Sequence, residues 1–186
     1  MAPSKDSSEN KSSAEERREF VRTHRTCVFG YGRPHDGPAL SVVYYVPTES
    51  DELLISTMAA RGKARAVGRN AKVRLCVLDE RWPFAYLQVY ADAVVDRDPQ
   101  LVVDVMMAVA WRMSGQQLND EARPVVAARA AEERRVVVRC RPYATFAQPS
   151  RHLERSDDQQ AVTTGPHRLS PGRPPDPSWL GAARGT

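Results

Sequence analysis

LLISTMAARGKARAVGRNAKVRLCVL, residues 53–78, is the stretch that most constrains the fold and the function of this chain. It contains no Asp or Glu. Its six cations are Arg61, Lys63, Arg65, Arg69, Lys72 and Arg74. Because the whole chain of 186 residues has a formal net charge of +4, this stretch accounts for more than the entire positive balance. Such a local basic block indicates a site for a specific anion, most simply a phosphate.

The spacing of these cations predicts how they would be presented. On a short helix over residues 62–70, Arg61, Arg65 and Arg69 lie four apart and would share a face, while Lys63 would lie elsewhere on the turn. Backbone N–H groups without a partner at the start of a helix favour an anion. The paired N–H donors of an arginine guanidinium match the oxygens of a phosphate. A solvated basic face accounts for the same residues about equally well. A nucleic-acid site is disfavoured, because the sequence has no recognition helix and no aromatic RNA-binding strand motif.

Alternation and turn signals on both sides of this stretch predict the remaining elements. Strands are expected over residues 26–31, 39–47, 53–57, 73–78, 84–96 and 135–147, and helices over 14–23, 62–70, 99–114 and 121–133. Asp36-Gly37 marks a hairpin turn, Asp98-Pro99 marks a helix start, and Pro142 marks an edge or a bulge in the last strand. We therefore expect a mainly β fold with inserted helices, in which five or six antiparallel strands form a small barrel.

Composition divides the chain into one domain and two tails. Residues 13–147 are expected to form the globular domain, and the polar residues 1–12 and the Pro- and Gly-rich residues 148–186 are expected to be disordered. No apolar run approaches the roughly 18 residues of a membrane helix, and the start of the chain has no signal-peptide pattern. The chain is therefore expected to be cytoplasmic and away from membranes.

The cysteines and histidines exclude the commonest metal chemistry. The three cysteines are odd in number and form no CxxC, so they are expected to be reduced core residues. The four histidines have no ligand spacing with them, and we expect no metal site.

No nucleophile, base or carboxylate pair typical of hydrolytic catalysis is apparent. Tyr31, Tyr44, Tyr45, Tyr86 and Tyr90 of the predicted strands could each supply a proton or orient a substrate, and of these Tyr44 and Tyr45 are the candidates for a proton donor, although packing explains a strand tyrosine better. Ser56 and Thr57 end a strand just before the basic block, where they would contact a ligand or simply cap the strand. An absent acid–base apparatus fits a binding protein, or an enzyme whose cofactor carries the chemistry.

The order of elements, the stretch LLISTMAARGKARAVGRNAKVRLCVLDE, the segment EERREFVRTH and the Trp82-Pro83 turn resemble a known family. They are similar to the split β-barrel flavin and deazaflavin oxidoreductases of the pyridoxamine 5'-phosphate oxidase-like superfamily, an FMN-binding-like fold, and particularly to its actinobacterial coenzyme F420-dependent branch. Ala66 stands where that family usually has Asn, and Asn70-Ala71 stands where Asp-Pro is common.

The resemblance implies a homodimer with two cofactor sites at the subunit interface. It implies phosphate ligands at Lys63 and Arg65, with Ser56 and Thr57 beside them. Arg61 and Arg69 would extend the basic rim, which in deazaflavin proteins meets an acidic oligoglutamate tail. Trp82 and Pro83 would lie near the cofactor ring.

The expected function follows from that resemblance. The protein would transfer a hydride between reduced coenzyme F420 and a conjugated organic molecule such as a tetrapyrrole, quinone, enone or secondary metabolite. The alternatives are an FMN-dependent oxidase or reductase on the same fold, and a flavin- or deazaflavin-binding protein without catalysis.

Overall fold

The computed structural model describes residues 12–81 and 84–148. The predicted disorder of residues 1–12 and 148–186 falls almost wholly outside these ranges, as do Trp82 and Pro83. The helices are α1 (Ala14–Thr23), α2 (Gly62–Arg69), α3 (Pro99–Ser114) and α4 (Arg123–Glu132), with a 3-10 turn, η1, at Asp120–Ala122. The strands are β1 (Thr26–Arg33), β2 (Asp36–Tyr44), β3 (Val46–Pro47), β4 (Leu53–Met58), β5 (Lys72–Asp79), β6 (Ala85–Asp96) and β7 (Arg135–Gln148).

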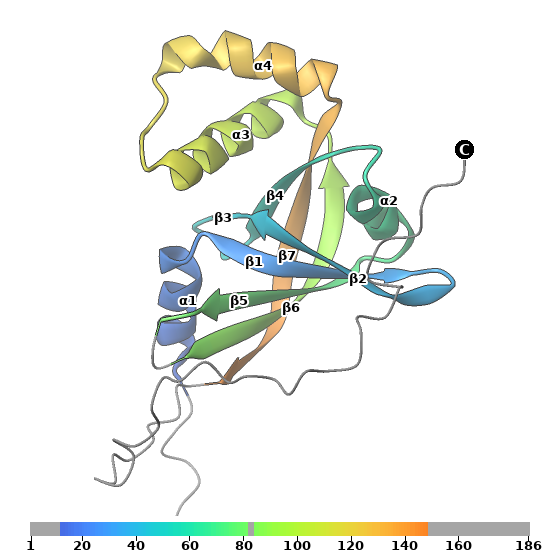
Figure 1. The fold of residues 1–186 in the computed structure, drawn as a ribbon, viewed down its shortest axis with the longest axis vertical. Coiled ribbons are helices and arrows are strands. Elements are labelled where there is room, and N and C mark those ends of the chain that lie inside the picture. The colour runs from blue at the N-terminus through green and yellow to red at the C-terminus, as the bar shows by residue number, and fades with distance from the viewer. Residues whose placement is uncertain (1–11, 82–83, 149–186) are drawn as a thin grey trace, which may run out of the picture. The chain divides into compact units, whose positions relative to one another are not determined.

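The seven strands form one antiparallel sheet in the order β2-β1-β5-β6-β7-β4-β3 (Figure 1). The inner face of β6 is buried because its apolar residues alternate with polar ones, as the sequence predicts. Leu87, Val89, Ala91 and Ala93 are each at most 2% exposed and join the main core cluster. β7 pairs with β6 on one side and with β4 on the other, so the last strand holds the two parts of the sheet together.

A single residue shows that the sheet curls into a barrel. β2 and β3 are the two edges of the sheet, yet only Tyr45 separates them along the chain. Consecutive residues are about 3.8 Å apart, so the two edges must lie close together. Tyr45 is fully buried, and its hydroxyl donates a 2.7 Å hydrogen bond to the Val21 carbonyl of α1. The predicted small barrel is confirmed in a split form, because β2 and β3, the two edges of the sheet, are not paired with each other.

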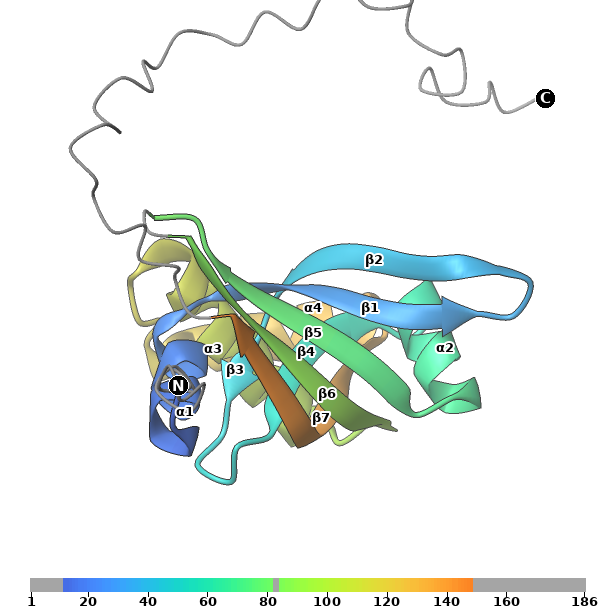
Figure 2. The ribbon, with the colours of Figure 1, turned by 90° about the horizontal axis from the view of Figure 1, so that it is seen from below.

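The helices cover different parts of the barrel. α1 and α2 lie at opposite ends of the strands, as both views show (Figures 1 and 2). α3 and α4 pack on the outer side of β4 and β7, where a second cluster is made of Leu54, Val102, Val105, Ala130 and Val137. The bounds of α1 and α3 are the predicted ones, and Asp98 and Gly115 cap α3 as expected.

Three sequence predictions need correction. The hairpin turn lies at Pro34 and His35 rather than at Asp36-Gly37, because Asp36 already pairs with Arg33 across the two strands through a 2.6 Å ion pair. The strand predicted over residues 39–47 is two strands, since the chain breaks at Tyr45 to change edges. This raises the strand number to seven, above the five or six expected.

Two details of the later elements also emerge. The helix predicted over residues 121–133 begins as a 3-10 turn, and the α-helix proper starts beside a proline. The expected irregularity at Pro142 is a bulge, because Tyr90 pairs with Ala144 and the next residue, Ala91, pairs with Pro142. Among the described helices, none is long and apolar enough to span a membrane.

Candidate functional site: a basic helix start

The structure divides the six cations of the basic stretch into two groups. Lys72 pairs with Asp92 at 2.7 Å, so its charge is neutralised within the sheet. Arg74 donates to the Tyr143 hydroxyl at 3.2 Å and lies 4.3 Å from the centre of the Tyr90 ring. Both residues therefore have structural partners on the outer face of the sheet.

The other four cations have no acidic partner among the described residues. Within the part of the chain that the structure describes, Arg61, Lys63, Arg65 and Arg69 make no ion pair with a carboxylate. The three arginines are exposed, whereas Lys63 is half-buried. Burial and, to a smaller extent, the neighbouring Arg61 hold the pKa of Lys63 below its ordinary value. A bound anion would offset both effects.

The start of α2 adds backbone donors to these side chains. Arg61 is the N-cap residue, its backbone is extended, and its side chain makes no capping hydrogen bond. The first N–H groups of a helix have no partner inside the helix, so those of the first turn of α2 remain available. Ala64, Ala66 and Val67 are buried and fix the helix against the barrel. The small residue Ala66, at the position where the family usually has Asn, therefore serves packing here.

Tyr31, one of the strand tyrosines considered in the sequence, is a neighbour of this helix start, a contact that the sequence did not predict. A Cβ atom added to Gly62 would lie only 2.8 Å from the Tyr31 hydroxyl oxygen. Tyr31 belongs to β1 and is half-buried, so its hydroxyl lies directly against the first turn of α2. No local pattern could have shown this, because the contact joins two elements about thirty positions apart in the sequence.

Ser56 and Thr57 do not point the same way. Successive side chains of a strand alternate between faces, so Thr57 shares the barrel-facing side of Leu53 and Ile55, and Ser56 shares the opposite side. Thr57 is 5% exposed. The Ser56 hydroxyl oxygen is buried without a hydrogen-bond partner among the described residues. A buried polar atom without a partner is unusual, and a water molecule, a ligand or another chain would satisfy it.

The two tyrosines proposed as proton donors differ in burial and in hydrogen bonding. Tyr45 is buried in the core, its hydroxyl is bonded to a backbone carbonyl, and burial raises the pKa of its phenol well above the ordinary value. It is therefore a structural residue in this protein. Tyr44 is half-buried at the end of β2, and its role as proton donor stays a prediction.

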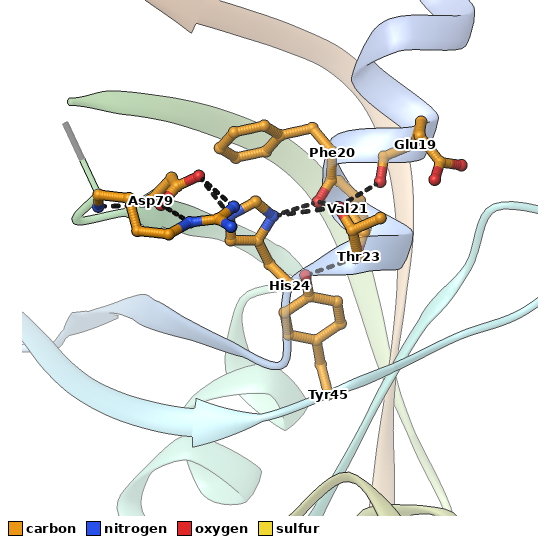
Figure 3. A network of polar contacts seen from close by, with 8 residues as sticks. Glu19, Phe20, Val21, Thr23, His24, Tyr45 and Asp79 are labelled. Atoms are coloured by element: carbon orange, nitrogen blue, oxygen red, sulfur yellow. Dashed lines mark hydrogen bonds and ion pairs between the residues drawn. The ribbon is translucent and has the colours of Figure 1, made fainter. Parts of the chain in front are cut away.

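A second polar cluster, around His24, is shown in Figure 3. The imidazole stacks on Phe20 at 4.1 Å, its Nδ1 lies 2.6 Å from the Phe20 carbonyl, and its Nε2 lies 3.5 Å from Asp79. Hydrogen bonds from Arg81 hold the pKa of Asp79 far below its ordinary value. Because both ring nitrogens already face oxygens of the protein, the cluster fastens α1 to the end of β5 and offers no open base to a substrate.

The described residues offer no cluster of side chains that could bind a metal ion. They contain no group of three or more His, Cys, Asp or Glu side chains that could hold a metal ion. All three cysteines are free thiols, and burial raises the pKa of Cys27 to about 12, which makes it unreactive.

Comparisons with known proteins place this geometry in context. The family model described as pyridoxamine 5'-phosphate oxidase matches residues 13–145. No curated protein matches the chain significantly. The conserved hypothetical protein Rv2991 from Mycobacterium tuberculosis has 24% identity and a TM-score of 0.66, over 76% of this chain and 87% of that chain.

Two further solved structures share the fold at lower identity. A structure described as an F420 reductase has 21% identity and a TM-score of 0.56, over 69% of this chain and 94% of that chain. The heme storage protein HutZ from Vibrio cholerae has 17% identity and a TM-score of 0.53, over 72% of this chain and 92% of that chain.

Proposed function

Because this chain belongs to the pyridoxamine 5'-phosphate oxidase family, we propose that it is an oxidoreductase that binds a phosphate-bearing flavin-type cofactor at the start of α2. One observation carries the proposal. Four cations on and beside one short helix have no carboxylate partner in the described chain, and the same helix start presents open backbone donors. Lys63 and Arg65 would hold the phosphate, and Arg61 and Arg69 would extend the basic rim.

The cofactor we favour is coenzyme F420. An oligoglutamate tail carries several carboxylates, and a rim with three exposed arginines suits such a polyanion better than it suits a single phosphate. One solved relative is described as an F420 reductase, which agrees with this choice. The cofactor would supply hydride transfer to or from a conjugated organic substrate such as a tetrapyrrole, quinone, enone or secondary metabolite.

The chain's own residues would then bind and orient the cofactor and exclude water from it. Lys63 is half-buried, so its ammonium would be less screened by solvent than an exposed one. Tyr31 sets the position of the first turn of α2 through its contact with Gly62. Tyr44 remains the candidate to deliver a proton, and water is the alternative source.

Two other functions are compatible with the same site. FMN carries a phosphate that the start of α2 would accept equally well, which gives an FMN-dependent oxidase or reductase. HutZ, which shares the fold, is described as a heme storage protein. A non-catalytic flavin or deazaflavin carrier is therefore the third candidate.

We further propose that the protein is a homodimer, with the cofactor sites at the interface. The outer face of the sheet supports this proposal. Leu40 and Val42 of β2 are 67% and 73% exposed, and Phe146 of β7 is 50% exposed. Direct strand pairing links Val42 to Phe146 in one row through Val28, Cys76 and Gln88, so the row crosses the sheet and is apolar except at Gln88. Monomers rarely leave such a patch in water.

Fluorescence titration with coenzyme F420 and, separately, with FMN tests the cofactor assignment. The Lys63→Ala/Arg65→Ala double variant removes two charge-assisted contacts of about 1.5–3 kcal/mol each, so we expect at least a hundredfold loss of affinity. Lys72→Ala is the matched control, because this cation lies in the same stretch but is already paired with Asp92. F420 binding should also weaken more steeply with salt than FMN binding.

The outcomes separate the candidates. F420 binding that the double variant loses and the control keeps supports the deazaflavin reductase, and reduction of an acceptor distinguishes it from a carrier. Binding of FMN alone moves the protein to the flavin branch, and binding of neither refutes the cofactor proposal. Light scattering of the unaltered protein and of Val42→Lys tests the dimer, since a charge at the most exposed residue of the row should give a monomer.

A further inference from the structure

One cavity lies not at α2 but beside α1. The two helices lie at opposite ends of the strands (Figure 1). The cavity has a volume of about 540 Å³, and it lies between α1, the β3–β4 turn and the strands β6 and β7. Leu53 lines it at the start of β4, whereas α2 follows the end of that strand. At about 3.3 Å per residue, the six-residue β4 alone separates the two places by roughly 20 Å. The cavity is therefore distinct from the basic helix start.

One face of α1 forms a wall of this cavity. Ala14, Arg17, Arg18, Val21 and Arg22 all line it, and their spacing of three and four residues places them on a single helix face. The opposite wall is apolar, with Leu53, Leu87 and Val89 from the barrel core. The lining thus combines an apolar body with a cationic rim, the usual plan of a small-molecule site.

The charges of the rim leave one cation without a carboxylate. Arg18 and Arg22 share two acids, because each lies within 3.5 Å of both Asp51 and Glu15. Arg17 is different. Its Nε donates to the Ser12 carbonyl and hydroxyl oxygens at 3.1 Å, and its Nη1 donates to the Thr145 hydroxyl at 3.0 Å. In the described residues its partners are all neutral, so the rim retains about one net positive charge.

We propose that this cavity binds an amphipathic organic monocarboxylate, with its carboxylate on Arg17 and its apolar body between the half-buried Pro47 and Pro142, above a floor of the buried Leu53, Leu87 and Val89. A guanidinium held by neutral oxygens keeps the charge that recognises a carboxylate. The cavity volume of about 540 Å³ falls within the range of roughly 300–1,000 Å³ that is usual for small-molecule pockets. This site does not depend on the cofactor proposed for α2.

Isothermal titration of the full-length protein with dodecanoate and with dodecyltrimethylammonium tests the proposal. The two probes share a chain length and differ in the sign of their charge. We expect saturable binding of dodecanoate only. Arg17→Met keeps the apolar stem and removes the charge, and it should weaken dodecanoate binding by about tenfold or more.

Two further variants refine the test. Asp51→Asn should tighten dodecanoate binding several-fold, because Asp51 neutralises Arg18 and Arg22; Asn also tolerates the positive φ of 64° at this position. Ala14→Phe fills the cavity from an exposed helix start and should weaken binding without disturbing the core. Arg25→Met is the control, since Arg25 is exposed and does not line the cavity.

The results decide the question separately from the cofactor. Dodecanoate binding that Arg17→Met weakens, and that Lys63→Ala/Arg65→Ala leaves unchanged, supports the proposal even if no flavin binds. Absence of saturable binding, equal binding of both probes, or equal binding by Arg17→Met and the unaltered protein would overturn it. Circular dichroism of each variant confirms that the fold is retained.

Discussion

Replacing Gly62 with alanine tests whether the start of α2 is held in place by Tyr31. The new Cβ would lie 2.8 Å from the Tyr31 hydroxyl oxygen, and the next ring atom would be 3.7 Å away. Since unstrained contacts begin near 3.5 Å, the ring or the helix start must move by about 0.7 Å. Such overpacking costs about 1–3 kcal/mol, so we expect urea denaturation to show a loss of about 1–2 kcal/mol for Gly62→Ala. Phosphate-bearing cofactors should also bind more weakly, because the first-turn N–H groups would be displaced.

The same helix offers a matched control. Gly68 has nothing within 4 Å of an added Cβ, so Gly68→Ala should stabilise the protein by up to about 1 kcal/mol through helix propensity alone. Tyr31→Phe removes the hydroxyl that causes the clash, and the double variant Gly62→Ala/Tyr31→Phe should recover most of the loss relative to Tyr31→Phe. If Gly62→Ala proves as harmless as Gly68→Ala, or if its cost persists without the hydroxyl, the contact does not set the helix position and the reasoning fails.

Lys63→Met should raise the melting temperature by roughly 1–3 °C in the absence of ligand, because burial disfavours the charged amine; a lower melting temperature would contradict this. Hydrogen bonds from Arg139 hold the pKa of Glu52 below its ordinary value of 4.5, so this carboxylate stabilises the fold above about pH 4.5 and loses that effect as the pH falls. Urea midpoints measured from pH 6 to pH 3 should therefore fall more steeply for the unaltered protein than for Glu52→Gln. Ile55→Ala removes a fully buried core side chain and should cost about 2–5 kcal/mol by denaturant unfolding, and a cost below 1 kcal/mol would place Ile55 outside the core. Asp98→Ala removes the cap of α3 and should cost about 1 kcal/mol in the same assay, whereas Asp98→Asn should cost much less.

Local signals predict the elements whose ends depend on local chemistry. α1 and α3 have the predicted bounds because serine and aspartate caps, and a glycine in the left-handed region after α3, act within a few residues. The turn at Asp36-Gly37 is wrong by two residues, since the pairing of β1 with β2 extends past the dipeptide that usually marks a turn. The break at Tyr45 is invisible in the sequence, because the apolar pattern continues through it and only closure of the barrel requires it.

The candidate site follows the same division. The spacing of Arg61, Arg65 and Arg69 correctly separates them from the half-buried Lys63. Which cations lack a partner is a tertiary property, because Asp92 comes from the neighbouring strand. The contact of Tyr31 with Gly62 and the neutral partners of Arg17 depend in the same way on elements that meet only in the folded barrel.

The pairing of β4 with the last strand has a consequence for synthesis on the ribosome. Glu52, just before β4, bonds to Arg139, 87 positions later in the chain. At about 5–20 residues per second, the nascent chain therefore carries an apolar strand whose β7 edge is unpaired for roughly 4–17 seconds before β7 is made. An apolar edge exposed for so long invites pairing with other chains. We expect chaperones to hold nascent chains stalled before residue 135, and to release them once the chain has extended past residue 148 and β7 can enter between β4 and β6.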